Sequence, residues 1–135
     1  MNRSRIVIAD DHLGIIEKIT QLLELEFDVV GTVSDGQALL PAVAELQPDV
    51  VILDITMPGI NGIEAARQLK QAGSTAKPIF LTIHEDPDFL VAALLAGAHG
   101  YVVKSRLTSD LIQAVHEALA NRTFVSSFKA TEGKG

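Results

Sequence analysis

Short runs rich in valine and isoleucine recur along the chain, and they constrain its fold more than any other feature. Five such runs are present, at residues 5–9, 28–33, 50–53, 79–82 and 100–103. Their apolar residues are consecutive rather than alternating, which is typical of strands covered on both faces, as in a parallel sheet.

The segments between these runs carry apolar residues at helical spacing. The apolar stripes lie within residues 15–23, 39–46, 63–69, 90–94 and 111–119. Because strands alternate with helices, the sequence predicts an α/β fold of five βα units on a parallel sheet. Pro41 lies inside the second stripe, so we expect that helix to begin near residue 40 or to be kinked.

Composition and charge exclude several classes of protein. The chain has 135 residues, of which 47% are hydrophobic, values typical of one globular domain. It has no cysteine, which excludes a disulfide scaffold and a thiolate metal site and favours a reducing cytoplasm. A net charge of −6 argues against direct nucleic-acid binding. The longest uncharged apolar stretch, residues 89–98, is too short to span a membrane, so we expect no membrane contact.

The helical and strand periodicity ends near residue 121. Residues 1–121 contain no linker or low-complexity segment and are predicted to form the domain. Residues 122–135 are small and polar, and they are interpreted as a C-terminal tail or the first part of a linker.

Charged and hydroxyl residues follow the predicted strands at the ends where a parallel sheet forms its binding crevice. Asp10 and Asp11 follow the first strand, and Asp54 follows the third. Thr82 ends the fourth, and Lys104 follows the fifth. Three carboxylates and one ammonium leave surplus negative charge, which raises a carboxyl pKa unless a cation binds. Mg²⁺ suits one or two carboxylates together with phosphate oxygens and water.

These residues carry a resemblance to the receiver domains of two-component response regulators. The matching features are the pair Asp10-Asp11, the motif Asp-Ile-Thr-Met-Pro-Gly-Ile-Asn-Gly at 54–62, Thr82 after IFL and Lys104 after GYVV. The resemblance covers residues 4–121. It implies a flavodoxin-like, doubly wound (βα)5 fold of three layers, with a five-stranded parallel sheet in the order 2-1-3-4-5.

The resemblance also implies a phosphorylation site. Asp54 would accept a phosphoryl group from a sensor histidine kinase in a Mg²⁺-dependent reaction. Asp11, Asp54 and the backbone carbonyl of Thr56 would hold Mg²⁺, with Asp10 acting mostly through bound water. Lys104 would pair with the phosphoryl oxygens. The domain would be a switch with only self-phosphorylation and self-dephosphorylation activity, rather than a turnover enzyme.

Thr82 and Tyr101 would form the switch. In the family the hydroxyl moves to the phosphoryl group, and the aromatic ring turns inward into the space vacated. The surface of the fourth helix, fifth strand and fifth helix is thereby remodelled. Thr56, Ile83 and His84 stand at positions that border the site, where they would tune the rate of hydrolysis and the access to Asp54.

Two departures from the common family pattern point to a subfamily. Ser105 stands where many receivers have proline, which leaves open whether the preceding peptide bond is cis; bulky Ile83 stands where many have a small residue. These choices, with residues 121–127, resemble receivers of LuxR-type helix-turn-helix regulators. The resemblance implies control of a DNA-binding output domain that this chain lacks, or alternatively a stand-alone receiver. Homodimers through the switch surface or through the first and fifth helices are a further family expectation.

Other functions remain open at this stage. A haloacid dehalogenase-type phosphatase would place a second aspartate two positions after the nucleophile, where this chain has Thr56. A flavodoxin-like flavin carrier would need a phosphate-binding loop rich in Ser, Thr and Gly, where residues 9–12 are acidic. A pseudo-receiver would serve only as a docking module. Thr82, Tyr101 and Lys104 each also have an ordinary structural interpretation.

Overall fold

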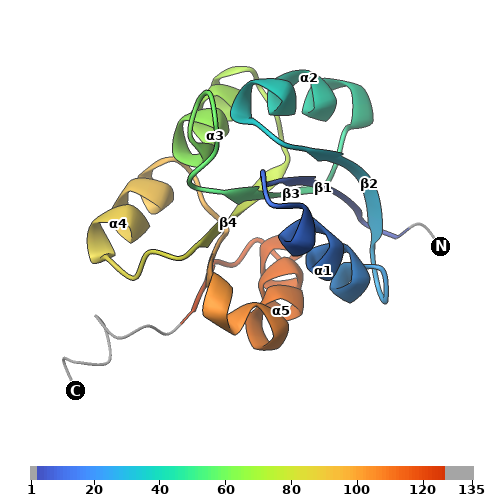
Figure 1. Ribbon diagram of the computed structural model, residues 1–135. Coiled ribbons are helices and arrows are strands. Elements are labelled where there is room, and N and C mark those ends of the chain that lie inside the picture. The colour runs from blue at the N-terminus through green and yellow to red at the C-terminus, as the bar shows by residue number, and fades with distance from the viewer. Residues whose placement is uncertain (1–2, 127–135) are drawn as a thin grey trace.

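The computed structural model describes residues 3–126 and shows alternating strands and helices (Figure 1). The strands are β1 (Arg5–Ala9), β2 (Asp28–Val33), β3 (Val50–Asp54), β4 (Lys77–Thr82), β5 (Gly100–Val103) and β6 (Phe124–Val125). The helices are α1 (Leu13–Leu23), α2 (Gly36–Leu46), α3 (Gly62–Gln71), α4 (Pro87–Leu95) and α5 (Leu107–Leu119). A 3₁₀ turn, η1 (Lys104–Arg106), leads from β5 into α5.

All strands of the described chain form one parallel sheet, in the order β2-β1-β3-β4-β5-β6. The predicted order 2-1-3-4-5 is therefore confirmed for the first five strands. The order reverses direction between β1 and β3, which is the position where open α/β sheets form their binding crevice.

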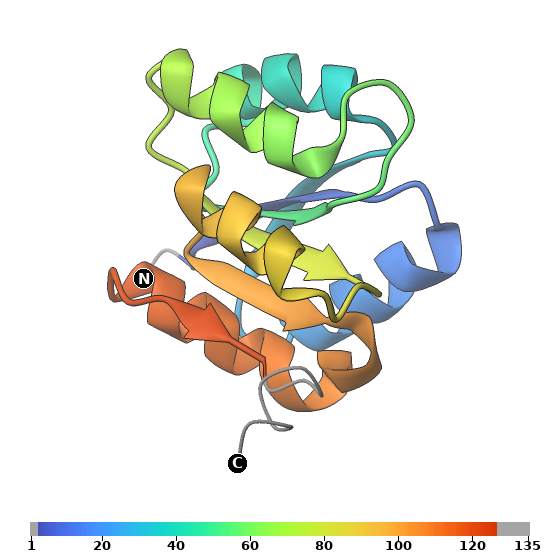
Figure 2. The same ribbon diagram turned by 90° about the vertical axis from the view of Figure 1, so that its left-hand side faces the viewer.

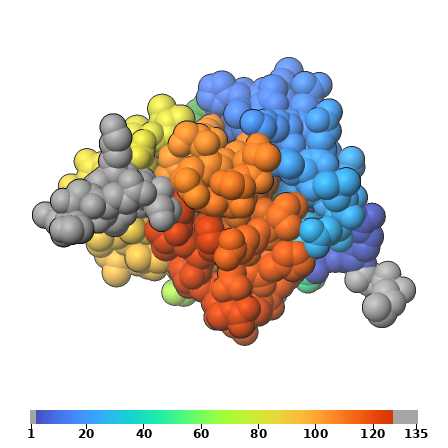
Figure 3. All heavy atoms as spheres, turned by 90° about the horizontal axis from the view of Figure 1, so that it is seen from below, coloured from blue at the N-terminus to red at the C-terminus, as the bar shows by residue number. Residues whose placement is uncertain are grey.

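Helices cover both faces of the sheet and give three layers. One apolar core lies beneath α2, α3 and α4 and includes Leu39, Ala66 and Ala93. The other lies beneath α1 and α5 and includes Ile19 and Leu111. Figure 1 shows the two groups of helices on opposite sides of the sheet, and Figure 3 shows α5 on the surface formed by the second group. The strands β1 and β3 are buried on both faces, as their consecutive apolar residues predicted.

The second helix differs from one expectation. It begins at Gly36, so the alternative in which it begins near residue 40 is wrong. The carboxylate of Asp35 accepts a hydrogen bond from the backbone nitrogen of Ala38 at 2.7 Å, and this cap starts the helix upstream of Pro41. Pro41 consequently lies within the helix.

The sixth strand was not predicted. Phe124 and Val125 pair in parallel with Gly100 and Tyr101 on β5, and Figure 2 shows the two strands side by side. Ser126 continues this contact by donating its backbone N–H to the carbonyl oxygen of Tyr101 at 2.8 Å. The segment predicted as a tail or linker thus begins with a strand, and its residues 127–135 lie outside the described residues.

Between residues 3 and 126, no helix has both the length and the apolar character needed to cross a bilayer.

Candidate functional site

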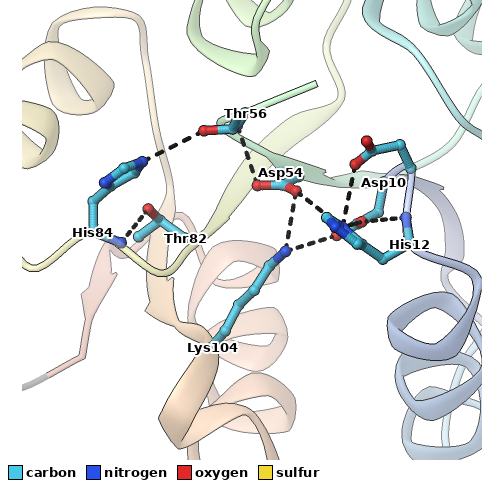
Figure 4. Close-up of polar contacts among 8 residues, drawn as sticks. Asp10, His12, Asp54, Thr56, Thr82, His84 and Lys104 are labelled. Carbon is cyan, nitrogen blue, oxygen red and sulfur yellow. Dashed lines mark hydrogen bonds and ion pairs between the residues drawn. The ribbon is translucent and has the colours of Figure 1, made fainter. Parts of the chain in front are cut away.

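The carboxyl ends of four strands bring the predicted site residues together (Figure 4). Ala9 pairs with Leu53, so the residues that follow them, Asp10 and Asp54, meet at the same edge of the sheet. By the same logic, Thr82 pairs with Val103 on β5, which places Lys104 immediately beyond that strand end.

Lys104 is the shared counter-ion of two buried aspartates. Its Nζ lies 3.0 Å from Oδ2 of Asp54 and 3.2 Å from Oδ2 of Asp10. Asp10 is fully buried, Asp54 is 4% exposed, and the Lys104 side chain is 12% exposed. Asp11 is exposed at the mouth of the site. The structure therefore provides more carboxylates than cations in one partly dehydrated crevice.

The loop after β3 presses closely against Asp54. Gly62, the first residue of α3, donates its backbone N–H to the carbonyl of Ile55 at 2.8 Å. A Cβ on Gly62 would lie 2.2 Å from the carbonyl oxygen of Asp54, so only glycine allows this approach. Asn61 caps the same helix by accepting a hydrogen bond from the backbone nitrogen of Glu64 at 2.9 Å. The residues at the end of the 54–62 motif thus hold the loop that carries Asp54.

Burial raises the pKa of the Asp54 carboxyl above its usual value, and the Asp10 carboxylate adds to the rise. Hydrogen bonds from Lys104 and from the backbone nitrogen of Thr56, at 3.0 and 3.2 Å, oppose this change without cancelling it. Burial works to lower the pKa of Lys104, but Asp54 and Asp10 outweigh it and raise that pKa. Lys104 therefore stays charged, and the aspartates remain short of positive charge.

The donor atoms of this crevice fit a hard divalent cation. Asp10, Asp11 and Asp54, together with His12, each present one potential ligand atom, and all four atoms lie within 4.8 Å of one another. Oδ2 of Asp10 is buried, and among the described residues its one donor is the ammonium of Lys104, which it shares with Asp54. Carboxylate oxygens in this number match the preference of Mg²⁺, so the residues fit the ion that the sequence analysis predicted.

His12 is a member of this cluster that the sequence analysis did not select. Its Nδ1 lies 3.0 Å from Oδ1 of Asp10 and 3.2 Å from Oδ1 of Asp11, and Figure 4 shows the ring directed toward the carboxylates. The signal in the sequence was its position directly after the acidic pair.

Thr82 and Tyr101 contact each other beside the carboxylates. The Thr82 hydroxyl accepts a hydrogen bond from the backbone nitrogen of His84 at 2.8 Å and is also hydrogen-bonded to Tyr101. Tyr101 is fully buried, and burial raises the pKa of its hydroxyl to about 12, although the bond with Thr82 opposes the shift. The aromatic ring thus lies inside the domain in this structure.

The predicted tuning residues line one side of the site. Nε2 of His84 lies 3.4 Å from the hydroxyl of Thr56, and Figure 4 shows this contact bridging the loops after β3 and β4. The ring of His84 stacks on Phe89 of α4 with a centroid separation of 4.2 Å. Ile83 is exposed at the rim. No peptide bond from residue 3 to residue 126 is cis, so the bond before Ser105 is trans.

Known proteins are similar to this chain in both sequence and fold. Residues 6–116 match the family described as "Response regulator receiver domain". The transcriptional regulatory protein DegU of Brevibacillus brevis is 40% identical over 116 residues, which cover 84% of this chain and 49% of DegU. The chain therefore spans about half the length of this curated relative.

Two solved structures show the same architecture. A two-component response regulator of the LuxR family from Aurantimonas sp. SI85-9A1 has a TM-score of 0.86 and 35% identity, covering 91% of this chain and 89% of that one. The isolated receiver domain of RcsB from Salmonella enterica serovar Typhimurium, solved in the presence of phosphomimetic BeF3⁻, has a TM-score of 0.86 and 30% identity. That match covers 93% of this chain and 95% of the RcsB chain. The expected similarity to receivers of LuxR-type regulators is confirmed.

Proposed function

This chain belongs to the response regulator receiver domain family, and from that premise we propose that Asp54 is its phosphoryl acceptor. The observation that carries the proposal is the position of Asp54, at the end of β3, buried and in contact with Lys104 at 3.0 Å. An acceptor carboxylate must be held in place and must have a cation beside it, because the phosphoryl group that it receives is anionic.

In the proposed reaction, a carboxylate oxygen of Asp54 attacks the phosphorus of a phosphohistidine on a sensor kinase. The new O–P bond forms as the P–N bond breaks, and the electron pair of the P–N bond returns to the imidazole of the kinase. Lys104 already contacts Oδ2 of Asp54 and would pair with the phosphoryl oxygens as they arrive. Oxygens of Asp10, Asp11, Asp54 and the Thr56 carbonyl would hold Mg²⁺, with Asp10 acting through water. That ion supplies positive charge toward the phosphoryl oxygens when bound.

The same site would return to its starting state by hydrolysis. We assign Thr56, Ile83 and His84 to control of the water that attacks the phosphoryl group, because they border the site from the loops after β3 and β4. The domain would act as a switch that phosphorylates and dephosphorylates itself, with no other substrate.

Thr82 and Tyr101 would transmit the phosphorylation state. The Thr82 hydroxyl is bonded to Tyr101 and to the loop that begins at Ile83, so a phosphoryl group that attracts this hydroxyl would alter both contacts. Tyr101 lies on β5 between α4 and α5, so the α4-β5-α5 surface would carry the response. The population shift is limited by the difference in these contacts between the two states.

Mass spectrometry tests the acceptor directly. The protein is incubated with Mg²⁺ and a small acyl-phosphate donor, and a gain of one phosphoryl group is expected. Asp54→Asn should abolish the gain, whereas Asp28→Asn, an exposed aspartate at the start of β2, should retain it. A full gain in Asp54→Asn would overturn the assignment of the acceptor.

The relatives support a proposal for the cellular role. Receivers partner with sensor histidine kinases, and DegU, of which this chain covers 49%, is named as a transcriptional regulatory protein. We therefore propose a cytoplasmic receiver that controls a DNA-binding output domain, without binding nucleic acid itself; a stand-alone receiver is the alternative. An acyl-phosphate-dependent change in DNA binding by a longer protein containing this domain would support the first, and no change would favour the second.

Homodimers through α4-β5-α5 are part of the same proposal. Val91, Leu94 and Leu95 are exposed on α4, and Val125 is partly exposed on the neighbouring strand β6. Apolar side chains gathered on one surface favour association. The other arrangement uses α1 and α5. Analytical ultracentrifugation of Leu95→Glu, with exposed Leu13→Glu on α1 as its counterpart, distinguishes the two surfaces.

A further inference from the structure

His12 occupies a position from which its imidazole can serve the cation site. The residue lies between β1 and α1, and its side chain is 63% exposed while Nδ1 faces the carboxylates (Figure 4). Its backbone nitrogen donates a hydrogen bond to Oδ1 of Asp10 at 2.9 Å, which fixes the start of the side chain beside the crevice. Nothing in the proposed phosphoryl transfer requires a histidine here.

The distances from Nδ1 to Asp11 and Asp54 have the pattern of ligands around an octahedral ion. With metal–ligand bonds of about 2.1 Å, adjacent ligands are about 3.0 Å apart and opposite ligands about 4.2 Å apart. Nδ1 of His12 lies 3.2 Å from Oδ1 of Asp11, which matches adjacent positions. It also lies 3.0 Å from Oδ1 of Asp10, which would act through water. It lies 4.0 Å from Oδ2 of Asp54, which matches an opposite position.

A second observation points to a ligand in this space. Asp10 is fully buried, and among the residues that the structure describes its Oδ2 meets the ammonium of Lys104 and no other donor. That ammonium lies 3.2 Å from Oδ2 of Asp10 and 3.0 Å from Oδ2 of Asp54, so the two carboxylates share it. A buried carboxylate that shares its cation with a second carboxylate favours a further positive group nearby.

We propose that His12 is a nitrogen ligand of the cation site, which thereby accepts first-row divalent transition ions in preference to Mg²⁺. The inference rests on the proposed metal site of Asp11 and Asp54 and adds a specificity-determining residue to it. Mg²⁺ is a hard ion that takes oxygen ligands, whereas imidazole nitrogen suits transition ions. Removing the imidazole should therefore weaken Mn²⁺ binding severalfold and change Mg²⁺ binding much less.

The probe is Mn²⁺, whose electron spin detects directly bound nitrogen. Electron spin-echo envelope modulation of the Mn²⁺-loaded protein should show coupling to a histidine ¹⁴N, and ¹⁵N-histidine labelling should change it. The coupling should vanish in His12→Asn, which keeps a polar side chain at an exposed position, and should persist in His84→Ala. Calorimetric titration of Mn²⁺ and Mg²⁺ into the same proteins should show a smaller preference for Mn²⁺ in His12→Asn.

Asp11→Ala separates the inference from the site on which it rests. If Asp11→Ala loses Mn²⁺ but the wild type shows no histidine coupling, His12 is only a hydrogen-bond partner and the inference is wrong. If Asp11→Ala binds Mn²⁺ as the wild type does, the proposed metal site itself is wrong. Loss of the coupling in His84→Ala instead of His12→Asn would also overturn the proposal.

Discussion

Two buried aspartates, Asp54 and Asp110, show how the same type of side chain can have different roles in this domain. They are 4% and 6% exposed, and each is paired with a cation, Lys104 at 3.0 Å and Arg106 at 2.9 Å. Their pKa values nevertheless move in opposite directions. Burial raises the pKa of Asp54, whereas the pKa of Asp110 is held below its usual value.

The difference lies in the neighbours. Burial also works to raise the pKa of Asp110, but hydrogen bonds from Ser126, Arg106 and Ser109, at 2.7, 2.9 and 3.0 Å, outweigh it. Among the described residues, Asp54 has one close lysine, which it shares with Asp10, another carboxylate. A carboxylate satisfied by donors stabilises a fold, whereas one that competes for a cation has capacity for a ligand.

One of the three donors to Asp110 is Ser126, the residue that follows the sixth strand. Ser126 donates from Oγ to Asp110, accepts from the backbone nitrogen of Val103 at 3.2 Å, and donates its own N–H to Tyr101. These contacts join the start of α5, the strand β5 and the segment after α5 into one unit. Asp110 therefore fastens the C-terminal segment to the strand that carries Tyr101.

The largest difference between the Asp54–Lys104 and Asp110–Arg106 pairs is expected when the cation of each pair is replaced. Lys104→Met is expected to slow phosphoryl incorporation on the order of 100-fold, because it removes positive charge from the transferring group. Arg106→Met is the matched control and should leave the rate unchanged. Rates are measured by mass spectrometry over time; equal rates in both variants would contradict the distinction.

Replacing the carboxylates should change stability in opposite directions. Asp110→Ala is expected to lower the free energy of unfolding by about 1–3 kcal/mol, because Ser126 and Arg106 lose a buried acceptor. Asp54→Asn should raise it at neutral pH and in the absence of divalent ions, since it removes a repelling charge. Urea denaturation followed by circular dichroism measures both; destabilisation by Asp54→Asn would refute the comparison.

The hydrogen bond from Ser126, the residue after the sixth strand, to Asp110 can be tested by itself. Ser126→Ala should lower the free energy of unfolding by about 1 kcal/mol, the net value of a typical hydrogen bond. The effect stays small because Asp110 keeps its hydrogen bonds with Arg106 and Ser109. Ser109→Ala, at an exposed position, is the counterpart and should lower the free energy of unfolding by less. A loss in Ser126→Ala as large as in Asp110→Ala would show that the serine alone anchors the segment.

The pH dependence of stability should carry the smallest signal. The lowered pKa of Asp110 contributes stability that is present above the unfolded value, near 3.8, and lost as pH falls through the folded pKa. The raised pKa of Asp54 contributes stability that is present below 3.8 and lost as pH rises through its folded pKa. Relative to wild type, Asp110→Asn should therefore lose less stability on acidification to about pH 3 and Asp54→Asn more. Identical acid profiles in the two variants would contradict both assignments.

The sequence alone determined the five βα units, because apolar periodicity is a local property that follows from which faces of each segment are buried. It also indicated that Asp10, Asp54, Thr82 and Lys104 meet, because strand ends in a parallel sheet share one edge. Their functional roles remain predictions. For the second helix, the alternative of a start near residue 40 was wrong, since the cap at Asp35 starts the helix upstream of Pro41.

The tertiary structure alone decided the sixth strand, the bond between Ser126 and Asp110, and the position of His12 among the carboxylates. Phe124 and Val125 are too short a run to show a period, and they form a strand only because the edge of β5 offers hydrogen bonds. Whether a buried aspartate is satisfied or short of charge depends on neighbours distant in sequence. That distinction between Asp54 and Asp110 arises only when the chain has folded.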